Sequence, residues 1–172
     1  MPLFHSTRNR HKPGEIILPG NFGRIINDAG PKHYLYFREM KIEAFRAAHY
    51  PEKPSRLKAT FHTDNIETAT AYRDSRAPGD FIYEVEMVDP AANTHRACVH
   101  AIQAYPGWPE EAVFNGYWTG ELWFTVDEYP GVVWAEYVST SPLRVIKRIR
   151  RKNHSAASRT GAASTPHSRG GR

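Results

Sequence analysis

Histidine, hydroxyl, arginine and carboxylate side chains occur together in a few short motifs that could bind a ligand or support a reaction. In chain order these motifs are His5-Ser6-Thr7, Pro13-Gly14-Glu15-Ile16-Ile17-Leu18-Pro19-Gly20, Pro54-Ser55-Arg56, Phe61-His62-Thr63, Ile82-Tyr83-Glu84-Val85-Glu86 and Trp134-Ala135-Glu136-Tyr137-Val138. A carboxylate can stabilise positive charge that develops on a substrate, and an arginine can clamp a phosphate through paired donors. No motif is specific alone, so their order and spacing carry the prediction.

The common signatures of metal and nucleotide chemistry do not occur in this sequence. The nine histidines are scattered, and neither HExxH nor a Cys/His cluster with zinc spacing is present. The sequence also contains no GxxxxGK[ST], GxGxxG or GxSxG. We therefore predict no metal site, and the phosphate-loop, dinucleotide-binding and α/β-hydrolase classes have no support.

The order of the motifs resembles the ADP-ribosyltransferase-like superfamily. The likeness is strongest to small bacterial and phage domains related to rifampicin ADP-ribosyltransferases and to an allied family of unknown function, and it covers most of residues 3–150. In that family the opening strand carries a His-Gly-Thr-like triplet before a Pro/Gly-bounded loop, and a late strand carries a Glu. Here Ser6 replaces the glycine, and Phe61 stands where relatives often have Tyr.

The resemblance implies cleavage of the bond between nicotinamide and ribose in NAD, which is a substrate here. That cleavage builds positive charge on the sugar, as in glycoside hydrolysis. By this likeness Glu136 is the catalytic residue, which accepts a hydrogen bond from a ribose hydroxyl and stabilises the charge. The acceptor of the ADP-ribose is not identifiable and could be a protein, a nucleic acid or a small molecule.

The resemblance also implies a set of NAD-binding residues. His5 would bind the adenosine-side ribose, Ser6 would hold the nicotinamide amide through its backbone, and Thr7 would support the dinucleotide. Phe61 would stack on nicotinamide, and Thr63, just before the following helix, matches the threonine of the family. These residues, with Arg56 as a clamp for the pyrophosphate, complete the set: His5, Ser6, Thr7, Arg56, Phe61 and Thr63.

Each of these residues also has a purely structural interpretation. Glu136 could be an ordinary strand carboxylate, His5 a surface histidine and Phe61 a core aromatic. Arg56 could instead pair with Glu43 or another acid. A rival catalytic acid is Glu121, which follows a glycine beside aromatic residues.

Three functions therefore remain open from the sequence. The first is an NAD-dependent ADP-ribosyltransferase. The second is a non-catalytic binding or accessory protein that keeps the fold, which Ser6 and Phe61 make credible because a Cβ can obstruct close approach of a ligand and Phe lacks the Tyr hydroxyl. The third is an RNA 2′-phosphotransferase, which shares the fold class but requires several arginines in its pocket.

Helical and strand patterns alternate irregularly, which predicts an α+β domain with a mixed or antiparallel sheet and two or more short helices. Residues 38–49 form an amphipathic helix that places Met40, Ala44, Ala47 and Ala48 on one side, with Ile42 and Phe45 adjacent. A Glu43–Arg46 ion pair is expected on this helix. A second helix follows Asp64, which with Glu67 forms a capping-box-like start.

Strands are predicted for residues 3–7, 57–62 and 81–88. Residues 132–138 and 143–150 are predicted to form two further strands that pair as neighbours. The aromatic stretch 93–128 is assigned only loosely, as a short helix or loops followed by a strand through residues 122–126.

Charge is distributed unevenly along the 172 residues, whose net charge is +5. Residues 147–172 hold eight Lys/Arg and no acid, which leaves 15 basic and 18 acidic residues before them. Residues 152–172 contain no large apolar residue, so we predict a folded domain over 1–151 and a basic, disordered tail over 152–172. Weak nucleic-acid contact through this tail is a further hypothesis.

The bulk features of the sequence fit a reducing compartment, although they do not prove one. The single cysteine, Cys98, cannot form an internal disulfide and is expected to be a structural thiol. No apolar run approaches the roughly 20 residues that a membrane-spanning helix needs, and the N-terminus lacks a secretory signal. We therefore expect a cytoplasmic protein without membrane contact.

Overall fold

The fold is described here from a computed structural model of the chain. The structure describes residues 1–102, 107–121, 123, 125–126 and 129–150. The predicted tail at residues 152–172 lies outside the described residues, as do residues 122 and 124 of the predicted strand at 122–126, whose residues 125–126 are in a strand. The observed elements confirm an α+β fold with antiparallel sheets and short helices.

The first sheet has the strand order β1-β4-β9-β2. Its strands are β1 (Leu3–Thr7), β4 (Phe81–Met87), β9 (Leu143–Ile149) and β2 (Ile16–Ile17). Every pairing is antiparallel, and β4 is the long central strand, with β1 on one side and β9 on the other. The side chains of Tyr83, Val85, Leu143 and Val145 form an apolar cluster on one face of this sheet.

The second sheet has the order β3-β8-β5 and is also antiparallel. It comprises β3 (Thr60–His62), β8 (Ala135–Ser139) and β5 (Thr94–Cys98). A separate two-stranded sheet pairs β6 (Thr125–Val126) with β7 (Tyr129–Val133). The two larger sheets are joined by a bridge in which the backbone amides and carbonyls of Phe4 and Thr63 exchange hydrogen bonds of 2.8 and 2.9 Å.

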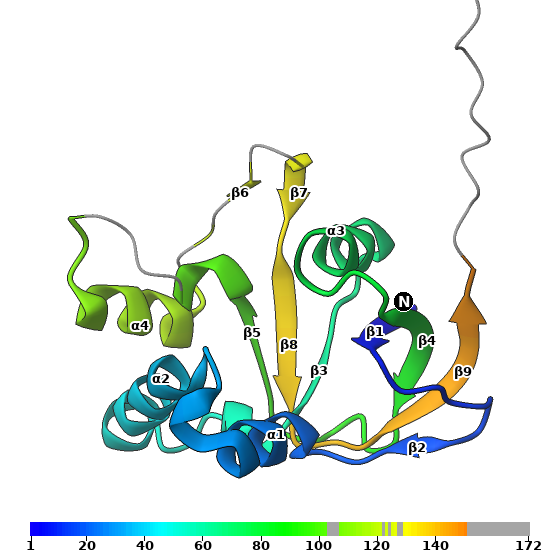
Figure 1. Cartoon of the computed structure of the whole chain (residues 1–172), viewed down its shortest axis with the longest axis horizontal. Helices are drawn as coiled ribbons and strands as arrows, with labels where there is room; N and C mark the ends of the chain where they lie inside the picture. Colours follow the sequence, from blue (N-terminus) through cyan, green and yellow to red (C-terminus); the bar gives the residue numbers. More distant parts are fainter. Residues whose placement is uncertain (103–106, 122, 124, 127–128, 151–172) are drawn as a thin grey trace, which may run out of the picture.

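In the described part of the chain, four α-helices pack against this framework: α1 (Asn21–Ala29), α2 (Tyr36–His49), α3 (Ile66–Arg76) and α4 (Glu110–Thr119). Short 3-10 turns are η1 (Gly30–Lys32), η2 (Arg56–Lys58) and η3 (Val99–Ile102). Figure 1 shows α2 and α4 side by side near β5, and α3 above β3 between β8 and the first sheet. The main core lies between the second sheet and the helices and includes Val138, Tyr117 and Trp118.

Strand alternation gives the second sheet two different faces. Phe61 is paired with Val138, and Glu136 is two residues before Val138, so all three side chains lie on the helix-covered face. His62 pairs with Tyr137, and Arg96 pairs with Tyr137 from β5, which places these three on the opposite face. This division decides which candidate residues can meet.

Several local predictions are confirmed and others are wrong. The helix at 38–49 is present as α2, but its buried residues are Glu39 and Ile42, whereas Ala44, Ala47 and Ala48 are exposed. The cap of α3 is Asn65, whose side chain accepts from the amides of Glu67 and Thr68, and not Asp64.

The pairing predicted between residues 132–138 and 143–150 is also wrong. β8 pairs with β3 and β5, whereas β9 pairs with β4 and β2, so the polar turn between them carries the chain from one sheet to the other. Within the described residues, no helix combines the length and the apolar composition that crossing a bilayer requires. Cys98 is fully buried in the main core, as a structural thiol would be.

Gly23 fixes how α1 meets η2. A Cβ at this position would lie 1.9 Å from the carbonyl oxygen of Leu57, so the helix can approach the η2 backbone this closely only with glycine. We expect Gly23→Ala to lower the free energy of unfolding by about 1–3 kcal/mol, because the helix or η2 must shift. Urea unfolding measures this, with the exposed Asn27→Ala on the same helix as control. Equal stability of the two variants would contradict the close-packing argument.

Candidate functional site

Arg56 is the centre of a polar network beneath the helices. It lies in η2, where the side chain of Ser55 caps the turn by accepting from the amide of Leu57 at 3.2 Å. The Arg56 side chain is only 4% exposed. A guanidinium cannot lose its proton, so a buried arginine requires nearby carboxylates and hydrogen-bond acceptors.

The first of these carboxylates is Glu39 on α2, which is fully buried. Arg56 Nε donates to Glu39 Oε2 at 3.0 Å. Arg38 donates to the other oxygen of Glu39 at 2.6 and 3.1 Å. Glu39 is therefore held between two arginines and uses both of its oxygens.

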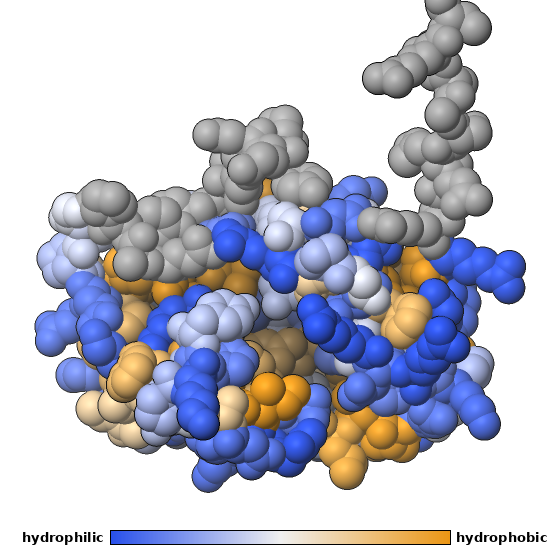
Figure 2. Space-filling view, viewed as in Figure 1, coloured by the Kyte–Doolittle hydropathy of each residue, from blue (hydrophilic) through white to orange (hydrophobic). Residues whose placement is uncertain are grey.

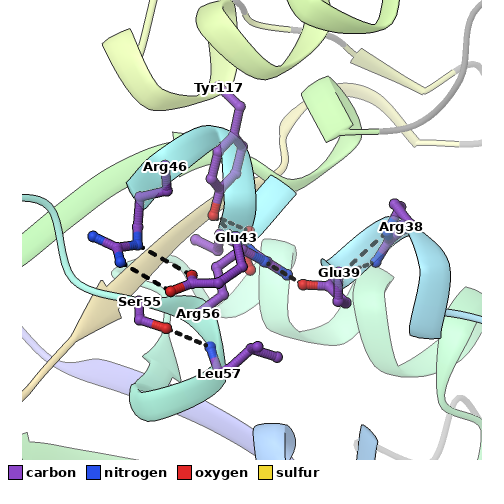
Figure 3. A network of polar contacts seen from close by, with 9 residues as sticks. Arg38, Glu39, Glu43, Arg46, Ser55, Arg56, Leu57 and Tyr117 are labelled. Atoms are coloured by element: carbon purple, nitrogen blue, oxygen red, sulfur yellow. Dashed lines mark hydrogen bonds and ion pairs between the residues drawn. The ribbon is translucent and has the colours of Figure 1, made fainter. Parts of the chain in front are cut away.

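The second carboxylate is Glu136 on β8. Arg56 Nη1 donates to Glu136 Oε1 and also to the hydroxyl of Tyr117 at 2.5 Å. The Tyr117 hydroxyl in turn donates to Glu136 Oε1 at 2.9 Å. Figure 3 shows Arg56 between Glu39 and Tyr117, beside the separate Glu43–Arg46 pair. The network ties α2, η2, α4 and β8 together.

Aromatic rings surround the Arg56 guanidinium. Its carbon lies 5.0 Å from the centroid of Phe61, 5.3 Å from that of Tyr117 and 5.9 Å from that of Phe22. Phe22 and Phe61 meet edge to face with centroids 5.4 Å apart. These rings exclude water from the arginine and strengthen its ion pairs.

Burial and charge set the protonation of this network. Burial alone would raise the pKa of Glu39, but Arg56 and Arg38 hold it below its usual value. Burial works against the charge of Arg56, yet Glu136 and Glu39 raise its pKa well above normal. Burial, together with Glu136, raises the pKa of Tyr117 well above its usual value despite the opposing charge of Arg56, so this hydroxyl stays protonated and can donate to Glu136.

Glu136 is partly open to solvent, with 15% of its side chain exposed. Both contacts described above use Oε1, and no described residue donates to Oε2. Figure 2 shows a hollow near the middle of this face, with hydrophobic residues on its floor, over β8 and β3, the strands that carry Glu136 and Phe61. The free oxygen can therefore accept a hydrogen bond from a ligand hydroxyl.

Tyr72 on α3 is a neighbour of the network that the sequence did not indicate. It is 39% exposed and meets the ring of Trp134 edge to face. Burial and the charge of Glu136 raise the pKa of Tyr72, with a smaller contribution from Asp80. Tyr72 thus lies within electrostatic range of Glu136 and of Asp80, whose carboxylate accepts from the Ser6 hydroxyl at 3.4 Å.

The opening triplet is divided between the two sides of β1. His5 pairs with Tyr83 and Thr7 with Phe81, so both lie on the side of the first sheet that faces away from α3. Ser6 lies on the α3 side. No described contact joins the His5 side chain to Glu136.

His5 reaches the site region only through a backbone group. Its Nδ1 is 2.7 Å from the carbonyl oxygen of Phe61, and burial lowers its pKa despite this hydrogen bond. The Thr7 hydroxyl accepts from the amide of Asn9 at 3.2 Å. His5 therefore stabilises the junction of the sheets and Thr7 the turn after β1, and neither lies in the Arg56 network.

The structure places the remaining predicted residues as follows. Arg56 does not pair with Glu43, which binds Arg46 as expected at 2.9 and 3.1 Å. Arg56 Nε and Nη1 donate to Glu39, Tyr117 and Glu136, and no described hydrogen bond uses Nη2, so the clamp for pyrophosphate stays a prediction. Thr63 belongs to the bridge between the sheets, and the rival acid Glu121 is exposed beyond the end of α4.

Glu39 and Tyr117 are network residues that sequence reasoning missed. The signal for Glu39 was an acid one helical turn before Ile42, the buried apolar residue of the same helix. Tyr117 lies in the aromatic stretch that was assigned only loosely, and a tyrosine next to a buried tryptophan on a helix was its one clue. Both residues come from segments whose packing the sequence does not define.

A second group of polar residues lies on the opposite face of the sheet. The His62 ring stacks on Tyr137 with centroids 5.2 Å apart, and the Tyr137 hydroxyl donates to Asp64 at 2.7 Å. His62 is 5% exposed, and its Nδ1 has no hydrogen-bond partner. Among the described residues, no group of three or more His, Cys, Asp or Glu side chains is placed to hold a metal ion.

Comparisons with known proteins do not assign the chain to a family. No protein-family model matches it, and no curated protein sequence matches it. The function must therefore be argued from the Arg56 network itself.

Loss of Glu39 should destabilise the protein severely. We expect Glu39→Ala to lower the free energy of unfolding by about 3–5 kcal/mol, because a buried arginine loses one of its two carboxylates. The half-buried Glu43→Ala should cost at most about 1 kcal/mol. Urea unfolding measures both, and Glu39→Ala combined with Arg56→Met should cost less than the sum of the single changes. Additive losses would show that Glu39 and Arg56 are not coupled.

Stability should also fall as the pH is lowered because of His62. Burial lowers the pKa of His62 from 6.5 to about 4, so the folded protein keeps it neutral while the unfolded chain binds a proton. The contribution of His62 to the free energy of unfolding is fully present above pH 6.5. It falls by roughly 3 kcal/mol as the pH is lowered from 6.5 to about 4. Urea unfolding at several pH values should give a smaller loss for His62→Gln than for the wild type. A His49→Gln variant, changed at an exposed position, should match the wild type.

Proposed function

We propose that the protein is an NAD-dependent ADP-ribosyltransferase in which Glu136 stabilises the reacting ribose. The observation that carries this proposal is the geometry of Glu136. One oxygen is fixed by Arg56 and Tyr117, while the other is free at a partly exposed position on β8. A carboxylate held in this way is oriented before substrate arrives, which is the arrangement that electrostatic catalysis requires.

The chemistry would proceed by cleavage of the bond between the ribose and the nicotinamide nitrogen. Nicotinamide leaves with the bonding electron pair and becomes neutral, and the positive charge moves to the sugar. The free oxygen of Glu136 accepts a hydrogen bond from a ribose hydroxyl and stabilises this charge. An acceptor nucleophile then bonds to the sugar carbon and loses its proton to solvent or a base.

Glu39 gives Arg56 a second anionic partner, and this matters for the proposed role. If Arg56 served Glu136 alone, the pair would be neutral and would attract a cationic sugar only weakly. With Glu39 and Arg38 included, the four charged groups carry no net charge, but Glu39 shares the charge of Arg56 and leaves less of it to neutralise Glu136. Arg56 and Tyr117 are thus positioning residues, and Glu136 keeps charge available for the transition state.

A non-catalytic binding protein is the second candidate, and one observation favours it. His5, to which the resemblance assigns a ribose contact, lies on the side of β1 that faces away from α3, whereas Glu136 lies on the helix-covered face. A chain that keeps the fold and the Arg56 network for stability alone would show this arrangement. An RNA 2′-phosphotransferase is less favoured, because that activity requires several arginines in the pocket, whereas Arg56 is the only arginine among the described residues that pairs with Glu136.

The test is nicotinamide release from NAD, with cell lysate supplied as a source of acceptors. We expect Glu136→Gln to reduce release by about 100-fold or more, because the neutral amide cannot stabilise the cationic sugar. Calorimetry should show that the variant still binds NAD, since Gln keeps the shape and its oxygen can still accept from Arg56. Glu121→Gln, changed at the exposed rival acid, should release nicotinamide at the wild-type rate.

Other outcomes separate the candidates. NAD binding without release from the wild type would favour the non-catalytic binding protein. Release that Glu136→Gln retains would leave the enzyme but remove Glu136 from its mechanism. Failure of the wild type to bind NAD would overturn the proposal.

A further inference from the structure

We propose that the first sheet carries a binding surface for single-stranded nucleic acid, formed by Arg10 and Arg148 around Phe81 and by Arg150, two residues after Arg148. This inference is independent of the proposed function, because none of these residues belongs to the Arg56 network. In Figure 2 hydrophilic side chains gather on the right of the view, over β9 and the turn between β1 and β2.

The surface has an excess of positive charge that its own acids do not balance. The acids from residue 80 to residue 86, on β4 and just before it, already have cations: Asp80 pairs with Arg8, Glu84 with Lys147 and Glu86 with Arg144. Arg10, Arg148 and Arg150 are exposed and form no ion pair with any described residue. Three arginines are therefore available to an anionic partner.

Two of these arginines are held in place by one aromatic ring. The guanidinium carbon of Arg148 lies 4.2 Å from the centroid of Phe81, and that of Arg10 lies 5.6 Å from it. Phe81 is at the start of β4, and the pairing of Tyr83 with Arg148 brings β9 alongside. The turn that holds Arg10 is fixed by the amide of His11, which donates to the Tyr83 hydroxyl at 3.0 Å. These contacts reduce the side-chain entropy that binding would cost.

The chemistry of the surface fits phosphates and exposed bases. Guanidinium groups bind phosphate oxygens in pairs, and their planar faces stack on unpaired bases. The chain continues from Arg150 directly into Arg151 and Lys152, and residues 151–172 contain five Lys/Arg and no acid. An anionic membrane is a poorer partner, because Phe81 is half-buried beneath the guanidinium groups and offers little apolar surface for insertion.

Fluorescence anisotropy with a labelled oligouridylate of about 20 nucleotides tests the proposal. The full chain is compared with Arg10→Glu/Arg148→Glu and with a matched control, Arg24→Glu/Lys58→Glu, which reverses two exposed charges on α1 and η2. A third variant changes the five cations of residues 151–172 to Gln, which separates their contribution from that of the surface. Thermal melting verifies that each variant folds.

We expect Arg10→Glu/Arg148→Glu to weaken binding about tenfold or more and to reduce the salt slope by about 1.4, since each single-strand phosphate contact contributes roughly 0.7. The control should bind more tightly than this variant, and the Gln variant should still depend on Arg10 and Arg148. The proposal is overturned if the two double variants bind equally. It is also overturned if the wild type binds a duplex more tightly than the single-stranded oligouridylate. Binding to vesicles of anionic phospholipid but to no oligonucleotide would overturn it as well.

Discussion

Burial of Arg56 is the constraint on which the rest of this structure depends. An arginine that is 4% exposed cannot become neutral, so its neighbours must supply negative charge and acceptors. They do so from three separate elements, with Glu39 on α2, Tyr117 on α4 and Glu136 on β8, around the capped turn η2 that carries Arg56. Misplacing any one of these elements would leave charge unpaired in the core. The same network that orders the helices also fixes the orientation of Glu136.

The fold class and most strands follow from patterns that the sequence displays directly. Alternation over residues 81–88 and the opening strand was sufficient because each pattern is local and regular. The order of strands in the sheets could not be predicted in this way, since β8 and β9 are neighbours in sequence but pair with different strands. Such pairing depends on contacts between residues far apart in the chain. Helix α1 was not predicted from the sequence for a similar reason. Its glycine at 23 disfavours a helix locally, yet packing against Leu57 requires it.

The candidate site was predictable only in part, for the same reason. Glu136, Arg56 and Phe61 were identified from short motifs and do meet, with Phe61 against the guanidinium and Glu136 bound to it. Glu39 was not identified, because the alanines of α2 suggested the wrong buried side. A carboxylate can be buried on the core side of a helix only when a cation pairs with it there. For Glu39 that cation is Arg56, which is 17 residues away in the chain. Local hydrophobic patterns carry no trace of such a partner.

The alternation of β1 is the strongest constraint on any function assigned to the protein. His5 and Ser6 are adjacent in sequence, so a regular strand must send their side chains to opposite sides. Ser6 lies on the α3 side and His5 on the same side as Tyr83, and it is Ser6 whose partner Asp80 lies, with Glu136, within electrostatic range of Tyr72. If NAD binds along the hollow, its contacts with β1 must involve the backbone and Ser6, unless the adenosine end crosses the edge of the sheet to His5. The helix-covered face, with the free oxygen of Glu136, is therefore where substrate chemistry would be decided, whatever role His5 retains.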